Sequence, residues 1–302
     1  MSNARDAAAA LAAGRLVILP TETVYGLAAD ARNPAAVAAL YEAKGRPAFN
    51  PLIAHVADVE AARGLADLDA RAVALAEAFW PGPLTLVATA KEGVCDLARA
   101  GLDTVAIRVP AHPVARAVLT AFCGPVAAPS ANRSGRPSPT TLADAIAETG
   151  AAAAVALDGG PCAIGLESTV ISLLEGPPRL LRPGAVTRVQ IEALIGPLAE
   201  AEADARRSPG RLTRHYAPVA PMRLEASDAR AGEAFIGFGA IGPVALNLSP
   251  AGDLAEAAAR LFSCLRAADA LAPSAIAVAP VPDVGLGEAI NDRLRRAAGQ
   301  LG

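Results

Sequence analysis

Apolar and polar positions along residues 1–195 alternate between helical stretches and short apolar runs. An Ala-rich helix is expected over 4–13, ended by Gly14, and the run LVIL at 16–19 is typical of a buried strand. Further strands are expected at 52–56, 84–90, 104–109, 125–128, 154–157, 168–174 and 179–181, and further helices at 34–43, 69–79, 113–122, 140–148 and 188–195. This interleaving of helices and strands predicts an α/β fold.

The alternation stops between about 196 and 220, where Pro, Gly and Arg dominate the segment RRSPGRLTRHYAPVAP. It resumes afterwards, with strands expected near 222–225, 234–238, 243–248 and 275–280 and helices at 251–271 and 286–298. The sequence therefore predicts three parts: a first domain at 1–197, a linker at 198–219 and a small second α/β domain at 220–302.

The 302-residue chain is 53% apolar and 19% charged, which is enough apolar material for a buried core and excludes a disordered polar polymer. Its formal net charge of -3 excludes an overall basic coat for nucleic acid but is compatible with a local basic patch. The N-terminus lacks the apolar core of a signal peptide, and Gly or Pro breaks the long uncharged stretches. Four scattered cysteines favour reduced thiols over disulfides or a zinc site, so we expect a cytoplasmic protein without membrane contact.

Several common catalytic motifs are absent from the sequence. Both lysines follow alanine, which excludes a P-loop because that motif needs Gly-Lys. The patterns HExxH and GxSxG do not occur, and the three dispersed histidines give no metal-ligand spacing. We therefore expect no metal site built from side chains.

Three polar segments rich in small residues follow predicted strands, which is where ligands bind in open α/β sheets. They are PTETVYGLAAD at 20–30, AKGRPAFNPL at 43–52 and APSANRSGRPSPTT at 128–141. Each taken alone could be an ordinary surface loop. The third segment comes just before a predicted helix N-terminus, and its hydroxyl groups and backbone N–H groups suit an anion.

The second segment carries two cations. Lys44 and Arg46 end a predicted helix and enter a loop constrained by Gly and Pro, which also holds Asn50. Cations at a helix C-terminus can act only as partners of the helix dipole. The alternative is a phosphate clamp, with Lys as a point charge and Arg as a planar fork. Lysine and asparagine are scarce in this chain, which favours the clamp.

Arg108 and Arg182 each end an apolar strand, where an arginine is costly unless an anion pairs with it. That anion is either a protein carboxylate or a ligand. His55, inside LIAHV, is typical of a core histidine or of a ligand contact. With Ser168 and Thr169 in LESTVIS, these residues supply anion-binding groups but no nucleophile–base pair. Residue chemistry alone therefore predicts a protein that binds a nucleotide or another polyanion.

In order and spacing these segments resemble the YrdC-like threonylcarbamoyl-AMP synthase family, in its long two-domain form. The resemblance rests on PTETVYGL, the KxR of Lys44 and Arg46, NPLIAH, WPGPLTLV, VAIRVP, the SxN of Ser130 and Asn132, ESTV and LRPGAV. SPG at 208–210 and HYAP at 215–218 extend it through the linker. The resemblance implies an α/β fold with a twisted mixed sheet and a concave basic face, followed by a smaller Rossmann-like C-terminal domain.

The resemblance implies a nucleotidyltransferase that condenses L-threonine, bicarbonate or CO2 and ATP into L-threonylcarbamoyladenylate and pyrophosphate. Magnesium (Mg2+) would accompany ATP, held mainly by its phosphates, and no organic cofactor would be needed. A separate complex would then transfer the threonylcarbamoyl group to tRNA, at an adenosine beside the anticodon. Direct contact with tRNA or double-stranded RNA is left open by the resemblance.

The family's site residues can be carried over to matching positions. The signature tetrad implies catalytic roles around the triphosphate for Lys44, Arg46, Ser130 and Asn132. ATP-binding roles are implied for Arg46, Asn50, Thr104, Ser130, Ser138 and Arg182, and threonine-binding roles for Thr23, His55, Arg108, Ala128, Ser168 and Thr169. Arg108 would hold the threonine carboxylate bidentately.

The linker carries more specific side chains than a passive tether needs. We predict that residues 208–218 fold over the nucleotide pocket as a lid, with Ser208, His215 and Tyr216 near ATP or pyrophosphate. A surface linker with solvated arginines is the alternative.

Two other functions fit parts of the sequence. A non-enzymatic module for double-stranded RNA binding or ribosome maturation would use the same basic concavity, although the aromatic platforms that single-stranded RNA needs are missing. A carbamoyl-adenylate-forming domain, as in hydrogenase maturation factors, would carry extra zinc-finger-like and acylphosphatase-like regions that this sequence lacks.

Overall fold

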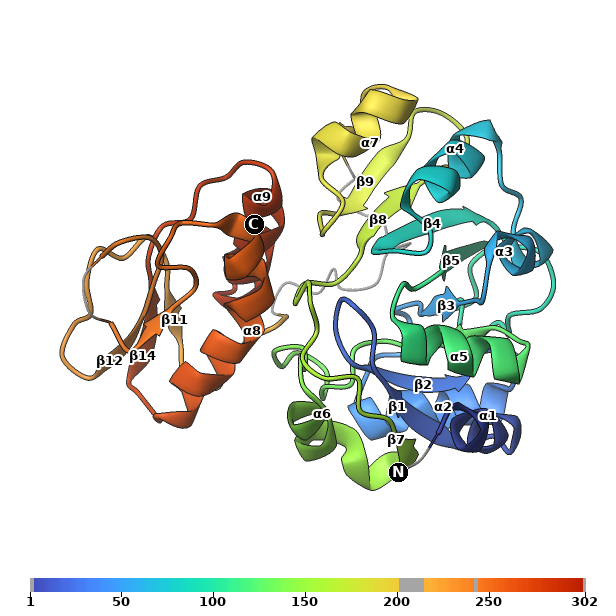
Figure 1. Ribbon diagram of the computed structural model, residues 1–302, viewed down its shortest axis with the longest axis horizontal. Helices are drawn as coiled ribbons and strands as arrows, with labels where there is room; N and C mark the ends of the chain where they lie inside the picture. Colours follow the sequence, from blue (N-terminus) through green and yellow to red (C-terminus); the bar gives the residue numbers. More distant parts are fainter. Residues whose placement is uncertain (1–2, 201–214, 242–243, 301–302) are drawn as a thin grey trace.

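The computed structural model describes residues 3–200, 215–241 and 244–300, which form two lobes (Figure 1). The larger lobe is built on one ten-stranded sheet. Its strands lie in the order β10 (Ala199–Glu200), β9 (Arg179–Arg182), β8 (Thr169–Ser172), β4 (Leu84–Thr89), β5 (Thr104–Arg108), β3 (Ile53–His55), β6 (Val126–Ala127), β2 (Gly26–Asp30), β1 (Leu16–Leu19) and β7 (Ala153–Ala156). Because β4 pairs antiparallel with β5 but parallel with β8, the sheet is mixed.

Helices cover this sheet. They are α1 (Ala4–Ala12), α2 (Pro34–Lys44), α3 (Val59–Leu65), α4 (Ala70–Phe79), α5 (Pro113–Phe122), α6 (Leu142–Thr149) and α7 (Arg188–Ile195), with a 3-10 turn at Gly150–Ala152. Local sequence sets their starts: the Asn33 side chain accepts backbone N–H bonds from residues 35 and 36, and Pro34 takes the first helical position. α2 therefore begins where the Asn-Pro pair predicts.

Side-chain alternation assigns each face of β1 its own helices. Val17 and Leu19 belong to the cluster that α1 and α5 complete, whereas Leu16 and Ile18 belong to the cluster that includes Leu40 of α2. A four-residue apolar strand of this kind is therefore buried on both faces, as the run LVIL predicts.

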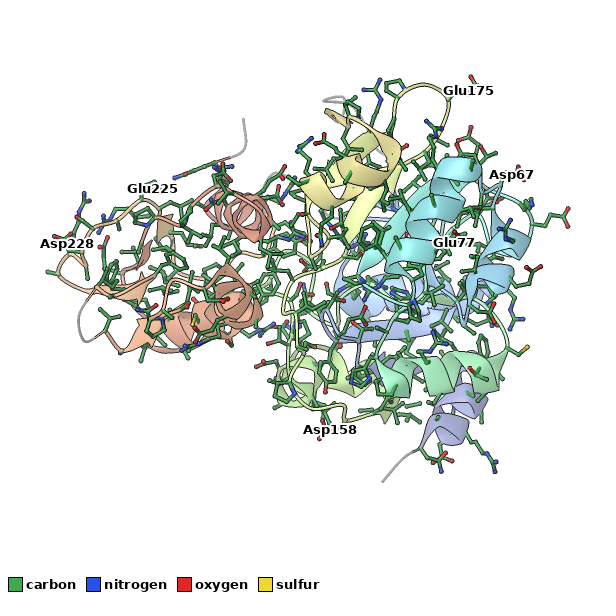
Figure 2. All side chains as sticks on the ribbon, turned by 45° about the horizontal axis from the view of Figure 1, so that its top comes forward. Asp67, Glu77, Asp158, Glu175, Glu225 and Asp228 are labelled. Carbon is green, nitrogen blue, oxygen red and sulfur yellow. The ribbon has the colours of Figure 1, made fainter. Side chains whose placement is uncertain are left out.

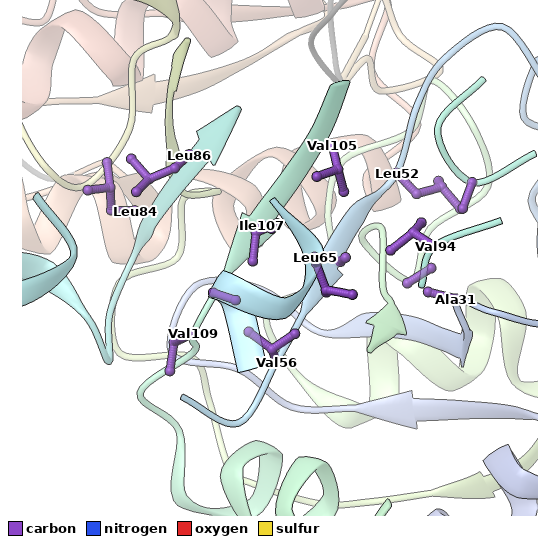
Figure 3. Close-up of a cluster of buried hydrophobic side chains, with 14 of the residues drawn as sticks. Ala31, Leu52, Val56, Leu65, Leu84, Leu86, Val94, Val105, Ile107 and Val109 are labelled. Carbon is purple, nitrogen blue, oxygen red and sulfur yellow. The ribbon is translucent and has the colours of Figure 1, made fainter. Parts of the chain in front are cut away.

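The same alternation gives β4 and β5 two different faces. Leu84, Leu86, Val105 and Ile107 lie in the main hydrophobic core, together with side chains of α3 and α4 (Figure 3). Successive side chains of a strand point to opposite faces, so Arg108 at the end of β5 lies on the other side of the sheet. The candidate site is on that side.

The smaller lobe is a parallel sheet with two helices. Its strands lie in the order β11 (Met222–Arg223), β14 (Ala275–Val278), β12 (Glu233–Gly237) and β13 (Leu246–Asn247). Its helices are α8 (Leu254–Ala270) and α9 (Leu286–Ala297), which lie on the side of the lobe that faces the larger one (Figure 1). The prediction of a mixed α/β sheet followed by a small second α/β domain is confirmed.

The two lobes share one hydrophobic cluster. Val24 and Leu166 of the larger lobe pack in it with Tyr216 and with α8 residues such as Phe262. At Gly165 the backbone comes so close to α8 that a Cβ atom would lie 2.5 Å from the Cα of Ala259. Only glycine fits there. The φ of Gly165 is +73, in the left-handed region that glycine adopts freely.

Ion pairs also cross between the lobes. Arg188 Nη2 lies 2.9 Å from Glu288 Oε1, and Arg266 Nη1 lies 3.0 Å from Glu148 Oε1. With the shared cluster, these contacts hold α8 and α9 against the larger lobe.

Most predicted elements are present within one or two residues, and α5, α7 and β1 have the predicted bounds. The elements that were not expected include β2, in the second half of the segment 20–30, α3, which begins after the Asp58 cap, and the short strand β10. β10 pairs with β9, so the first sheet runs past residue 197, and residues 201–214 of the predicted linker lie outside the described part. Of the helices that the structure describes, none is both long and apolar enough to cross a membrane.

Candidate functional site

A cavity lies on the sheet face that carries Arg108, where the first lobe meets residues 215 and 216. Its free space is about 50 Å³, which is room for a few water molecules. It is lined by Thr23, Val24, Arg46, Pro51, Leu52, Ile53, His55, Arg108, Ala128, Pro129, Ser130, Glu167, Ser168, Arg182, His215 and Tyr216. Most residues that the sequence predicted for the site therefore line one cavity.

Arg108 is held by three groups. Its Nε donates to the Gly82 carbonyl at 3.1 Å, its Nη1 to the Thr23 hydroxyl at 2.9 Å, and its Nη2 contacts Glu22 Oε1 at 2.5 Å. Burial disfavours the charge of Glu22, but the Arg108 cation and backbone N–H donors outweigh it and lower the pKa of Glu22. The sequence allowed either a protein carboxylate or a ligand as the anion that pairs with Arg108, and in the structure Glu22 is that carboxylate.

His55 lies on β3 beside Arg108, since the two residues are partners in the pairing of β3 with β5. Its ring is buried, and its Nδ1 has no hydrogen-bond partner among the described residues. Burial and the nearby Arg108 cation lower the pKa of His55 to about 3, so the imidazole is neutral at physiological pH. A neutral imidazole with a free nitrogen can accept or donate a hydrogen bond to a ligand.

Ser168 and Thr169 have different surroundings although they are neighbours. The Ser168 hydroxyl lines the cavity, 2.7 Å from the Thr85 hydroxyl and 3.1 Å from Arg182 Nη2. The Thr169 hydroxyl instead donates to the Val186 carbonyl at 2.6 Å and accepts from the Val186 N–H at 3.0 Å. Thr169 therefore ties β8 to the loop after β9, and Ser168 is the one of the pair placed for a ligand.

Arg182 and Arg46 supply cationic groups to the cavity. Arg182 donates through Nε and Nη2 to the Ser168 carbonyl at 3.1 and 2.9 Å. Arg46 donates to the carbonyls of Asn50 and Pro51 at 3.2 and 3.0 Å. Burial lowers the pKa of Arg46 to about 10, which still leaves it protonated at neutral pH. Both arginines are therefore oriented by backbone carbonyls and compensated by no carboxylate in these contacts.

Lys44 has a supporting position. Its ammonium group is buried and donates to the backbone carbonyls of Ser130 and Asn132. Burial, together with the Arg46 cation, lowers the pKa of Lys44 well below its ordinary value. Lys44 thereby joins the end of α2 to the SxN segment, and Ser130 carries that segment into the cavity lining.

The side chain of Asn132 bonds within its own loop, donating to the carbonyls of Arg133 and Arg136 at 2.7 and 2.9 Å. Several predicted residues share this buried position without lining the cavity. They are Lys44, Asn50, Thr104, Asn132, Ser138 and Thr169. Thr104 is at the far end of β5 from Arg108, whereas Ser138 contacts the lining residue Glu167.

Residues 215 and 216 close one side of the cavity. The rings of His215 and Tyr216 meet edge to face with centroids 3.9 Å apart, and both side chains are buried. The Tyr216 hydroxyl and His215 Nδ1 have no partner among the described residues. Burial, with the Arg46 and Lys44 cations, lowers the pKa of His215. The sequence predicted His215, Tyr216 and Ser208 near ATP or pyrophosphate; the first two line the cavity, and Ser208 lies outside the described residues.

Sequence reasoning missed two buried carboxylates and a buried arginine at the site. Glu22 belongs to PTETVYGL and Glu167 to LESTV, so their segments were singled out but their ion pairs were not. Arg293 of α9 contacts Glu167, and only the fold brings these residues together.

Acidic side chains at the periphery balance this concentration of arginine. Examples of exposed acidic side chains, labelled in Figure 2, are Asp67, Glu77, Asp158, Glu175, Glu225 and Asp228. The net charge of -3 therefore coexists with a cavity lined by three arginines and one glutamate.

A metal ion would find few protein ligands at this site. Among the described residues there is no group of three or more His, Cys, Asp or Glu side chains able to hold one. The buried side-chain oxygens that have no hydrogen-bond partner among the described residues include those of Asn50 and Asn132. Neutral amide oxygens can add to the ligands of a magnesium ion that is bound mainly by other oxygens, such as those of a phosphate.

Family comparisons agree with this geometry. Residues 9–184 match the family described as "Telomere recombination" (Sua5, YciO and YrdC), and residues 186–299 match "Threonylcarbamoyl-AMP synthase, C-terminal domain". The chain belongs to the two-domain threonylcarbamoyl-AMP synthase family. Proteins of that name from Pyrococcus abyssi and Bacillus subtilis are 42% and 41% identical to it, over 98% and 97% of this chain and 94% and 92% of theirs. The chain is thus an enzyme of this family, as its motifs predict.

Solved structures show the same architecture. P. abyssi Sua5 complexed with L-threonine has a TM-score of 0.91 at 38% identity, over 98% of this chain and 94% of that one. A P. abyssi Sua5 variant with alanine in place of an adjacent histidine and tyrosine has the same TM-score and identity, over 98% and 93% of the two chains. These likenesses confirm both lobes of the family fold.

Proposed function

We propose that this enzyme condenses L-threonine, bicarbonate or CO2 and ATP into L-threonylcarbamoyladenylate and pyrophosphate, for threonylcarbamoylation of tRNA beside the anticodon. The observation that carries the proposal is a single cavity in which Arg108 stands near two further arginines, Arg46 and Arg182. One cation suits the carboxylate of an amino acid, and the other two suit phosphates. The threonine complex of a relative supports the choice of amino acid.

Arg108 would bind the carboxylate of threonine. Three of its five N–H donors have partners among the residues that the structure describes, which leaves two donors for a ligand. The Thr23 hydroxyl and the neutral His55 ring flank this position, and Ala128 and Ser168 complete the lining. The hydroxyl groups and the imidazole can form hydrogen bonds with the polar groups of threonine.

The reaction needs positioning more than covalent chemistry. The neutral amine of threonine attacks CO2 or bicarbonate to give a carbamate, with release of a proton in the case of CO2 and of water in the case of bicarbonate. A carbamate oxygen then attacks the α-phosphorus of ATP, and the bond to the bridging oxygen of pyrophosphate breaks. Holding a weak nucleophile in line contributes up to roughly 7–11 kcal/mol in ideal systems. Arg46 and Arg182 would stabilise the charge that develops on pyrophosphate.

Room for ATP requires a movement at the cavity. A free space of about 50 Å³ cannot hold a nucleotide, and His215 and Tyr216 form one of its sides. We therefore propose that this pair moves away to admit ATP and returns to exclude water from the adenylate. This chain has one His-Tyr dipeptide, at 215–216, and an adjacent His and Tyr are the residues replaced in a solved variant of the relative.

Magnesium and RNA enter as further parts of the proposal. Magnesium, held mainly by ATP phosphates, would supply positive charge beside the leaving group, with Asn50 and Asn132 as protein oxygen donors. The product would pass to a separate complex that modifies tRNA.

Pyrophosphate release by the full-length protein tests the proposed reaction. We expect release from ATP only when threonine and bicarbonate are both present, with magnesium in the buffer. Release that is independent of threonine, or that needs carbamoyl phosphate, would contradict the proposed substrates. Omitting each component in turn provides the controls.

A further inference from the structure

The smaller lobe reaches the wall of the cavity through Arg293 of α9. This guanidinium is fully buried, and its Nε donates to Glu167 Oε2 at 2.9 Å. Its Cζ lies 5.3 Å from the ring centroid of Tyr216. Glu167 and Tyr216 both line the cavity, so Arg293 contacts two of its lining residues from behind.

Glu167 is an unfavourable neighbour for a polyanion unless its charge is balanced. Its Oε1 accepts a hydrogen bond from Ser138, and its Oε2 faces Arg293. A carboxylate beside a triphosphate repels it strongly in a water-poor cavity. The cation that contacts Glu167 directly belongs to the other lobe, so the charge of the cavity wall depends on how α9 is docked.

The hydrogen bonds of Arg293 leave it incompletely satisfied. Nη1 contacts Asp292 Oδ2 at 2.6 Å, but Nη2 is buried and has no hydrogen-bond partner among the described residues. The Tyr216 hydroxyl nearby is also buried without a partner. Buried donors of this kind are rare unless something else uses them. A structural clamp between lobes would have no need of either group.

We infer that Arg293 is a positioning residue of the nucleotide site, which neutralises Glu167 and holds the Tyr216 ring in the closed position that the ring takes again once ATP has entered. The smaller lobe thus completes the ATP site of the larger one. This inference rests on the ATP binding that the proposed function includes, and it goes beyond that function by assigning a role to a residue of the C-terminal lobe.

Calorimetric binding to the full-length protein tests the inference, with an α,β-methylene analogue of ATP and, separately, with threonine. Arg293→Met should weaken analogue binding about tenfold or more, since it leaves a buried carboxylate uncompensated. Threonine binding should change less than about threefold, because Arg108 is untouched. The double variant Arg293→Met with Glu167→Gln should recover most of the analogue affinity. Glu167→Gln alone should bind the analogue at least as tightly as the wild type, and this arm remains informative if Arg293→Met does not fold.

Glu288→Gln is the matched control, because it breaks another ion pair between the lobes away from the cavity lining. An equal loss of analogue binding in this control, or equal losses for both ligands in Arg293→Met, would show a general structural role and overturn the inference. So would unchanged analogue binding in Arg293→Met, a double variant that recovers nothing, or a tenfold loss in Glu167→Gln. A wild type that binds the analogue but never releases pyrophosphate would refute the proposed reaction alone. A wild type that does not bind the analogue would refute both.

Discussion

Arg108 and Glu22 form an ion pair at the wall of the cavity, with 2.5 Å between Nη2 and Oε1 and little exposure of either side chain. Glu22 is itself fixed, because its Oε2 accepts the backbone N–H groups of Ala111 and His112 at 3.0 and 3.3 Å. The guanidinium is therefore oriented before a ligand arrives. Such preorganisation lowers the entropic cost of binding a carboxylate.

Replacing Arg108 by Lys should impair threonine binding selectively. Lysine keeps the charge but lacks the planar fork, so the KM for threonine should rise about tenfold or more and the KM for ATP much less. Steady-state pyrophosphate release at varied threonine and varied ATP measures both. Arg32→Lys, at a surface ion pair with Asp30, is the control. Equal changes in the two KM values would contradict a carboxylate-binding role.

Replacing Lys44 by Met should reduce both activity and stability. The sequence alone favours a phosphate clamp, whereas in the structure the ammonium bonds to the carbonyls of Ser130 and Asn132. Leaving buried carbonyls unpaired should lower the free energy of unfolding by about 1–3 kcal/mol. Urea unfolding measures this, with the exposed Lys91 replaced by Met as the control. A fully stable but inactive Lys44→Met would favour direct phosphate contact instead.

Stability should fall in mild acid because of two buried histidines. The folded-state pKa of His55 is lowered to about 3, and that of His215 is also lowered, so each ring is neutral when folded but protonates near pH 6.5 when unfolded. The free energy of unfolding is therefore highest above pH 6.5 and decreases as the pH falls below 6.5, because the unfolded chain then binds protons that the folded chain does not. Between pH 6.5 and 5.0, protonation of His55 in the unfolded chain alone should remove about 1.5 kcal/mol from the free energy of unfolding, and His215 should act in the same direction. His55→Gln should reduce the fall seen by urea unfolding, and an unchanged pH profile would argue against a neutral buried His55.

Adding one methyl group at Gly165 should disturb the docking of the lobes. Its Cβ would meet the backbone of Ala259 at 2.5 Å, so α8 must shift. Gly160→Ala is the control, since Gly160 has nearly the same φ, +74 against +73, but nothing within 4 Å of its Cβ. We expect Gly165→Ala to increase the radius of gyration in X-ray scattering and to speed proteolysis between the lobes. Identical behaviour of the two variants would contradict the close approach.

Local signals in the sequence account for much of the fold. The Asn33-Pro34 cap sets the start of α2, and the run LVIL is a strand because branched apolar residues fill both faces of a central strand. The sequence did not predict the strand β2, because polar residues come directly before it. Its GLAAD sequence has no β-branched residue, and the strand is held by pairing with β1 and β6 instead.

The sequence singled out several residues that line the cavity, such as Arg108 and Ser168, but not the partners of these residues. The strand-end position of Arg108 indicated a paired anion, yet it could not distinguish Glu22 from a ligand. Thr169 and Ser168 look alike in sequence, and only the bonds with Val186 separate their roles. The pairing of Glu167 with Arg293 joins two lobes, and no local pattern reports such a distant contact.

The most direct test of the central claim is the composition of the product. The full-length protein is incubated with ATP, carbon-13 bicarbonate and nitrogen-15 threonine, and the nucleotides are separated and weighed by mass spectrometry. The account predicts one adenylate that carries both labels in equal amount, formed together with an equal amount of pyrophosphate. Pyrophosphate formed with an adenylate that lacks the bicarbonate carbon, or with AMP at all times, would contradict it.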